Sequence, residues 1–165
     1  MTRTFYRQLS AALLALALLL ACGLRAGAVG AADNFTATLP VSVTFWEEDS
    51  ESLSVVSDGV DDGREATLIR QSNGTYTLVL PIQTVSTVVF TGHLSGLTIG
   101  DIPYDGEVTG SFDDNTAVLT IRNLPSSVLT GSNVSRSLLV TCAIEMDVDL
   151  LGETTKTARM CIAVL

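Results

Sequence analysis

Histidine, lysine and tryptophan each occur once in this chain of 165 residues, as His93, Lys156 and Trp46. With a single histidine, no convincing triad of nucleophile, histidine and acid can be assembled. The sequence also lacks a GxSxG elbow, an HExxH motif and a glycine-rich phosphate loop. These absences argue against an enzyme. A general base or metal ligand is the functional interpretation of His93, and a partly exposed strand residue is the one we favour.

Basic residues are scarce as a class. The chain has nine lysines and arginines against 18 acidic residues, for a net charge of −9. Arg3, Arg7 and Arg25 lie in the first 31 residues, which contain no acidic residue, so residues 32–165 keep six basic and 18 acidic side chains and a net charge of −12. Nucleic acid and anionic membranes would repel such a chain. We therefore expect neither as a partner, except for a membrane reached through a lipid anchor.

The first 31 residues have the pattern of a secretory signal peptide. Arg3 and Arg7 precede an apolar run over residues 9–24, and small residues follow. The run is too short for an ordinary membrane span. Two processing routes stay open: simple cleavage, which we favour, and lipidation of Cys22, because LLAC at residues 19–22 resembles a lipobox. Either route predicts export, to the medium or the cell surface, and leaves residues 32–165 as a single domain.

The exported part reads as strands throughout. Segments rich in Thr, Val, Ile and aromatic residues occupy residues 36–46, 65–71, 74–82, 86–100, 116–124, 135–150 and 156–165. Turn signals separate them, among them Asp105-Gly106. No stretch shows a sustained helical period. The pattern predicts an all-β fold, an antiparallel immunoglobulin-like β-sandwich of about seven or eight strands.

The last two segments hold Cys142 and Cys161. Apolar residues at even positions predict a hairpin with that face in the core. A turn centred on Gly152 would set Cys142 opposite Ile162, Met146 opposite Ala158 and Glu145 opposite Arg159. The two cysteines then point to opposite faces, so a disulfide would need a bulge. We expect two separately buried thiols instead.

The longest predicted loop, residues 47–65, is acidic. Asp58, Asp61, Asp62 and Glu65 offer oxygen ligands for calcium, but their spacing matches no calcium loop. A solvated loop is the simpler interpretation. Within it, SESLSVVS at residues 50–57 is less polar and suits one helical turn at the mouth of a binding site.

The order of segments resembles a known family. EATLIRQSNGTYTLVLPI, VVFTGHLSGLTIGD and VLTIRNLP, followed by the final hairpin, are together similar to the NEAT domain, the near-iron transporter module of Gram-positive surface proteins, and most of all to divergent clostridial secreted versions. The similarity covers residues 37–165. It implies an immunoglobulin-like sandwich that binds haem between the final hairpin and a short helix in the first long loop. The usual axial ligand is a Tyr in a Y-x-x-x-Y pattern on the last strand.

This chain departs from that pattern because its last strand has no tyrosine. Tyr76 is predicted to lie in the core and Tyr104 to precede a turn. By location, the resemblance implies contacts from the first loop to haem propionates; its serines are Ser52, Ser54 and Ser57. Met146 and Met160 on the hairpin are substitute ligand candidates, although packing explains them more simply.

Two hypotheses follow for function. The first is capture of haem or a haem protein for iron acquisition. The second is an adhesion or interaction domain that binds a host or bacterial surface protein, or a glycan, and has lost haem. The missing tyrosine favours the second, and the order of segments favours the first.

Overall fold

The computed structural model describes residues 36–86, 91–147 and 152–165. The predicted signal peptide and Cys22 lie outside them. Within the described part there is no α-helix, and no helix long and apolar enough to cross a membrane. The strands are β1 (Ala37–Trp46), β2 (Ala66–Arg70), β3 (Tyr76–Pro81), β4 (Val85–Ser86), β5 (Thr91–Ile99), β6 (Ile102–Thr109), β7 (Val118–Leu124), β8 (Leu138–Met146) and β9 (Glu153–Val164). Three short 3₁₀ helices connect them: η1 (Val55–Gly59), η2 (Ser126–Val128) and η3 (Val134–Arg136).

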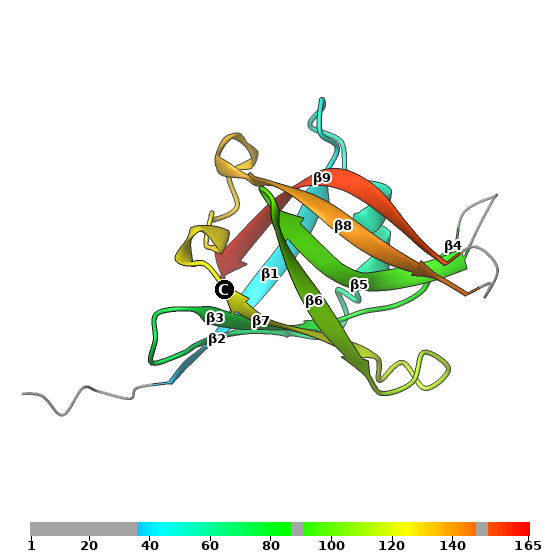
Figure 1. The fold of residues 1–165 in the computed structure, drawn as a ribbon, viewed down its shortest axis with the longest axis horizontal. Coiled ribbons are helices and arrows are strands. Elements are labelled where there is room, and N and C mark those ends of the chain that lie inside the picture. Colours follow the sequence, from blue (N-terminus) through cyan, green and yellow to red (C-terminus); the bar gives the residue numbers. More distant parts are fainter. Residues whose placement is uncertain (1–35, 87–90, 148–151) are drawn as a thin grey trace, which may run out of the picture. The chain divides into compact units, whose positions relative to one another are not determined.

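The strands form one closed antiparallel sheet, not the two stacked sheets of a sandwich. Their order is β4-β5-β6-β7-β3-β2-β1-β9-β8, and β5 also pairs with β8, which closes eight strands into a barrel with β4 attached (Figure 1). β5 achieves this because a register shift between Leu94 and Gly96 bends it at the point where it leaves β4 for β6. The all-β antiparallel prediction is confirmed, and the sandwich is corrected to a barrel.

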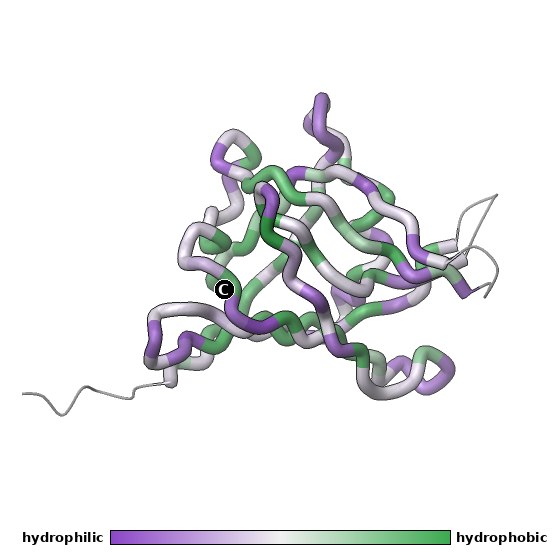
Figure 2. Tube along the Cα trace, viewed as in Figure 1, coloured by the Kyte–Doolittle hydropathy of each residue, from purple (hydrophilic) through white to green (hydrophobic). Residues whose placement is uncertain are grey.

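The core fills the barrel interior with alternate side chains of its strands. Phe45, Leu78, Leu119, Met160 and Ile162 are all completely buried there. Tyr76 belongs to the same cluster, as predicted. The hydrophilic residues gather in connections such as the loop after β1, at the top of Figure 2. The predicted strand alternation therefore separates core from surface correctly along most of the chain.

Strand β6 is the element that the sequence did not predict. The expected turn at Asp105-Gly106 is wrong, because both residues lie inside β6, opposite Gly96 and Ile121 on the neighbouring strands. A Cβ on Gly106 would collide with the side chain of Leu119 and the carbonyl of Ser95. The glycine is there to let three strands approach closely, not to reverse the chain. Tyr104 likewise lies within β6, and its prediction as a residue before a turn was wrong.

The final hairpin forms, but its predicted register is wrong by six residues. Cys142 lies opposite Lys156, not Ile162, and Glu145 lies opposite Glu153. The expected Glu145–Arg159 and Met146–Ala158 pairs are therefore absent from this part of the described chain. The predicted faces survive, since a shift by an even number keeps every side chain on its side. Cys142 belongs to the core, whereas the Cys161 thiol lies 3.9 Å from the Asn133 carbonyl, and both are buried and free, as predicted.

Candidate functional site

The candidate site is the mouth between the loop at residues 47–65 and the β8–β9 hairpin. The loop folds back on the end of β1 through a bridge between Trp46 and Leu53 and a bond from the Ser54 amide to the Phe45 carbonyl. η1 follows, with Val56 in the core, and it confirms one helical turn in this loop, at residues 55–59 rather than 50–57. The loop is therefore held against the end of the barrel by hydrogen bonds to β1 and by the packing of Val56 in the core.

The three candidate serines of this loop do different things. Ser52 is exposed, while Ser54 is only 1% exposed. The Ser57 hydroxyl accepts a bond of 2.8 Å from the Phe45 amide and donates one of 2.7 Å to the Phe45 carbonyl. On the side of β1 away from β9, Ser57 thus takes the place of a neighbouring strand at Phe45. The structure does not bring the three hydroxyls together toward one ligand.

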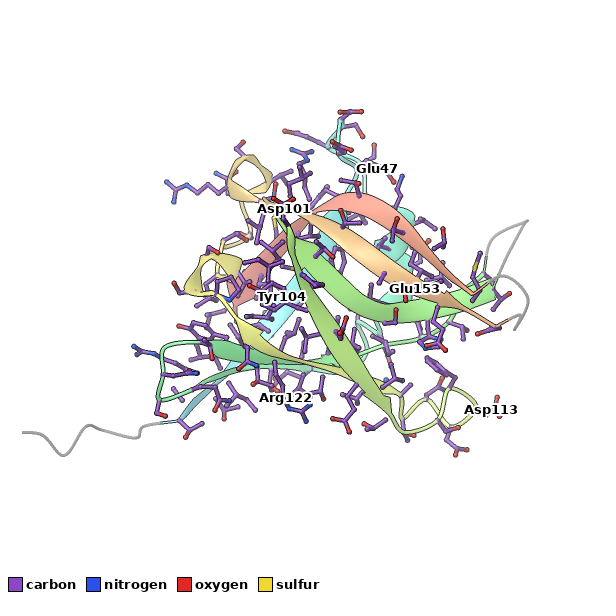
Figure 3. The ribbon with its side chains drawn as sticks, viewed as in Figure 1. Glu47, Asp101, Tyr104, Asp113, Arg122 and Glu153 are labelled. Atoms are coloured by element: carbon purple, nitrogen blue, oxygen red, sulfur yellow. The ribbon has the colours of Figure 1, made fainter. Side chains whose placement is uncertain are left out.

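Two cations of β9 fasten the loop to the hairpin. The Lys156 ammonium donates to the Glu47 carboxylate at 2.9 Å, and this bond is the main reason that the pKa of Glu47 is lowered. Arg159 donates to the Glu47 carbonyl at 3.0 Å and to the Ser50 carbonyl. Figure 3 shows Glu47 on the loop beside β9. We call Glu47, Lys156 and Arg159 the loop clamp.

Lys156, one member of the clamp, lies on the face on which a pocket was expected. Lys156 shares a face of the hairpin with its cross-strand partner Cys142, which lies in the core, so the lysine side chain emerges from the inner face at the mouth. Arg159, predicted to face Glu145, bonds the loop carbonyls instead. The role of Lys156 was not predicted from the sequence. Its only signal is that it is the single lysine of an acidic chain.

The two methionine candidates lie at opposite ends of the hairpin. Met160 is 0% exposed and pairs with Leu138, whereas Met146 lies partly buried eight residues further along β8. At about 3.4 Å per residue, this separates them by about 27 Å. They cannot act on one ligand atom, and Met160 packs in the core as the simpler interpretation predicted.

His93 lies on β5, opposite Glu145 of β8. Its side chain is 14% exposed, with Nε2 3.5 Å from Glu145 and Nδ1 3.9 Å from Asp147, and its ring packs on Phe112 with centroids 4.8 Å apart. The two carboxylates flank opposite ring nitrogens, so they do not converge with the imidazole on one point. The prediction of a partly exposed strand residue is confirmed.

No group of three or more His, Cys, Asp or Glu side chains in the described ranges is arranged to hold a metal ion. In the acidic loop, Asp61 is engaged by Arg64, while Asp58, Asp62 and Glu65 are spread along the surface. A calcium site therefore receives no support from this loop.

Comparison with known proteins identifies structures with a similar fold but no protein with a similar sequence. No protein-family model and no curated protein matches the chain. Among solved structures, the NEAT5 domain of IsdX2, a B. anthracis hemophore in complex with heme, aligns over 79% of this chain and 98% of its own with a TM-score of 0.51 and 8% identity. A point mutant of the same domain, also in complex with heme, gives the same score and identity over 79% and 97%. This chain has a NEAT-like fold.

The residues at the mouth of this NEAT-like barrel are not suited to act as axial ligands of a haem iron. Lys156, on the inner face there, is bound to a carboxylate, and an ammonium ion has no free electron pair to offer a metal. Tyr76 and Met160 are in the core, and His93 and Tyr104 belong to β5 and β6, away from the hairpin's last strand. Among the residues that the structure describes, no Tyr or His side chain is therefore placed at this mouth for axial ligation.

Proposed function

We propose that this NEAT-like domain is an exported, non-catalytic module that binds a protein or glycan partner. We propose further that it does not bind haem, because the residues described at its mouth supply no axial ligand for the iron. The observation that carries the proposal is the loop clamp. Glu47 and Lys156 join the loop to the inner face of the hairpin at 2.9 Å, where the resemblance implied a haem cleft. Arg159 reinforces the same junction from β9 through the Glu47 carbonyl.

Charge supports the same conclusion. Haem carries two negatively charged propionates, and the two cations of β9 that could offset this charge are already bound to the loop. Freeing them would leave Glu47 without its partner and add to the repulsion from a chain of strongly negative net charge. Retention of the fold without the ligand set is typical of a scaffold adapted to another partner.

Haem capture is the second candidate, because both of the aligned NEAT5 structures are complexes with heme. A hemin titration of residues 32–165, followed by Soret absorbance, separates the two. Under our proposal the spectrum stays that of hemin mixed with an inert protein. A saturable, sharpened band with one-to-one stoichiometry would overturn it in favour of haem capture, and Met146→Ala, Met160→Ala and His93→Ala would then identify the ligand.

A further inference from the structure

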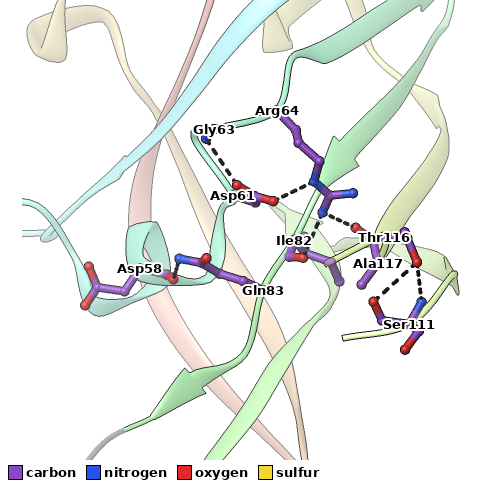
Figure 4. A network of polar contacts seen from close by, with 9 residues as sticks. All are labelled: Asp58, Asp61, Gly63, Arg64, Ile82, Gln83, Ser111, Thr116 and Ala117. Carbon is purple, nitrogen blue, oxygen red and sulfur yellow. Dashed lines mark hydrogen bonds and ion pairs between the residues drawn. The ribbon is translucent and has the colours of Figure 1, made fainter. Parts of the chain in front are cut away.

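Strand β1 runs on beyond the end of its pairing with β2. Their last pair is Val41 with Ala66, yet β1 continues to Trp46. The chain before β2 turns away from β1 toward β3 and β7. Val60 bridges Ile82, and the Arg64 guanidinium donates to the carbonyls of Ile82 and Ala117 (Figure 4). The barrel wall therefore has an opening beside residues 42–44.

The backbone of Val43 faces this opening. Ile162 lies opposite Val43 on β9, but its amide donates to Thr130 Oγ1 and its carbonyl accepts from Gly131. Val43 and Ile162 are thus a pair without mutual hydrogen bonds, and the polar groups of Val43 point the other way. No residue of the described ranges bonds them there. Phe45, which faces the same side, is satisfied by Ser57 and Ser54.

The opening forms a groove in the surface. A cavity of about 390 Å³ is lined by β1 from Val41 to Thr44, by residues 60–66 and by Leu165. A second of about 230 Å³ shares Val43, Thr44, Val60 and Asp62 with it and reaches Leu53. Leu53 and Leu165, at the two ends, are 58% and 72% exposed. The combined groove has the size of a ligand site and a partly apolar floor.

The rim of the groove is acidic. Asp58, Asp62 and Glu65 line it with exposed side chains, and none forms an ion pair with a described residue. Among the described lining residues its only cation is Arg64, which is engaged by Asp61 and by two carbonyls. The electrostatic complement of this rim is a positively charged partner.

We propose that the groove binds an extended peptide segment with lysine or arginine side chains, which adds as a short strand beside β1. One residue of the segment exchanges both backbone bonds with Val43, as in other recognition by strand addition. Its basic neighbours meet the acidic rim, and apolar ones meet Leu53 and Leu165. This inference rests on the proposed function, since it names a protein partner and the surface that takes it.

A defined peptide tests the inference. Fluorescein-labelled Val-Lys-Val-Lys-Val, capped at both ends, is titrated into residues 32–165 by fluorescence anisotropy, and unlabelled peptide into ¹⁵N-labelled protein. We expect saturable binding, with the largest amide shift and slowed hydrogen exchange at Val43. N-methylation of the central valine, which removes the donor to Val43, should weaken binding at least tenfold.

Charge is controlled by matched variants. Asp58→Asn/Asp62→Asn/Glu65→Gln should weaken binding at least tenfold. Asp105→Asn/Asp113→Asn/Asp114→Asn, which removes the same charge from exposed sites outside the groove, should weaken it less than threefold. Equal loss in both variants, indifference to N-methylation, or no shift at Val43 would overturn the inference. If peptide binding fails and the hemin titration also shows no complex, only the assignment of the groove as a peptide site is refuted. A saturable hemin complex would refute the proposed function itself.

Discussion

Ser57→Ala tests whether the serines of the first loop are structural. The Ser57 hydroxyl is the partner of the Phe45 amide at 2.8 Å, and Phe45 is completely buried. Alanine would leave that amide without a partner, whereas the Phe45 carbonyl would keep the Ser54 amide. A buried donor left unsatisfied costs about 1–3 kcal/mol.

Urea unfolding of residues 32–165 measures this cost. With a slope of about 1–3 kcal/mol per M for a small domain, a loss of about 2 kcal/mol lowers the urea midpoint by about 1 M. Ser52→Ala is the matched control, because Ser52 belongs to the same loop and is exposed. It should change the free energy of unfolding by less than about 0.5 kcal/mol. Equal midpoints for the two variants would refute the role assigned to Ser57.

Three further predictions concern packing, charge and thiol reactivity. Gly106→Ala should lower the free energy of unfolding by about 1–3 kcal/mol in urea, because its Cβ meets Leu119 and the Ser95 carbonyl. Lys156→Gln should cost less than about 1 kcal/mol at pH 7. Since the folded-state pKa of Glu47 lies below its ordinary 4.5, this stabilisation is present above pH 4.5 and the difference from wild type should vanish as pH falls further. Burial raises the pKa of Cys142 to about 12, so mass spectrometry after iodoacetamide at pH 8 should find it unlabelled until urea unfolds the chain.

Much of the barrel was predictable because its strands alternate clearly between core and surface. The segments around β1, β2, β3, β7, β8 and β9 were located within a few residues. β6 was not, since Pro103 and Asp105-Gly106 have the local chemistry of turns, and their strand conformation depends on neighbours on both sides. Closure into a barrel was equally invisible, because it depends on β5 pairing with a strand about 50 residues away.

The sequence predicted where the candidate site lies, but it did not predict which residues form it. Both the first loop and the final hairpin contribute, but the residues that join them are Glu47 and Lys156, which are 109 positions apart. Alternation determines which face a side chain occupies, and it does not determine register beyond that parity. A six-residue error in the hairpin therefore preserved the buried faces while assigning Arg159 the wrong partner.

The pairing of β1 with β9 also bears on how the chain folds. Val41, near the start of the barrel, lies beside Val164. During synthesis β1 must wait for nearly the whole domain before this neighbour exists, and at about 5–20 residues per second that delay lasts many seconds. The barrel therefore closes only after its last strand is made, because β9 must be present to pair with both β1 and β8.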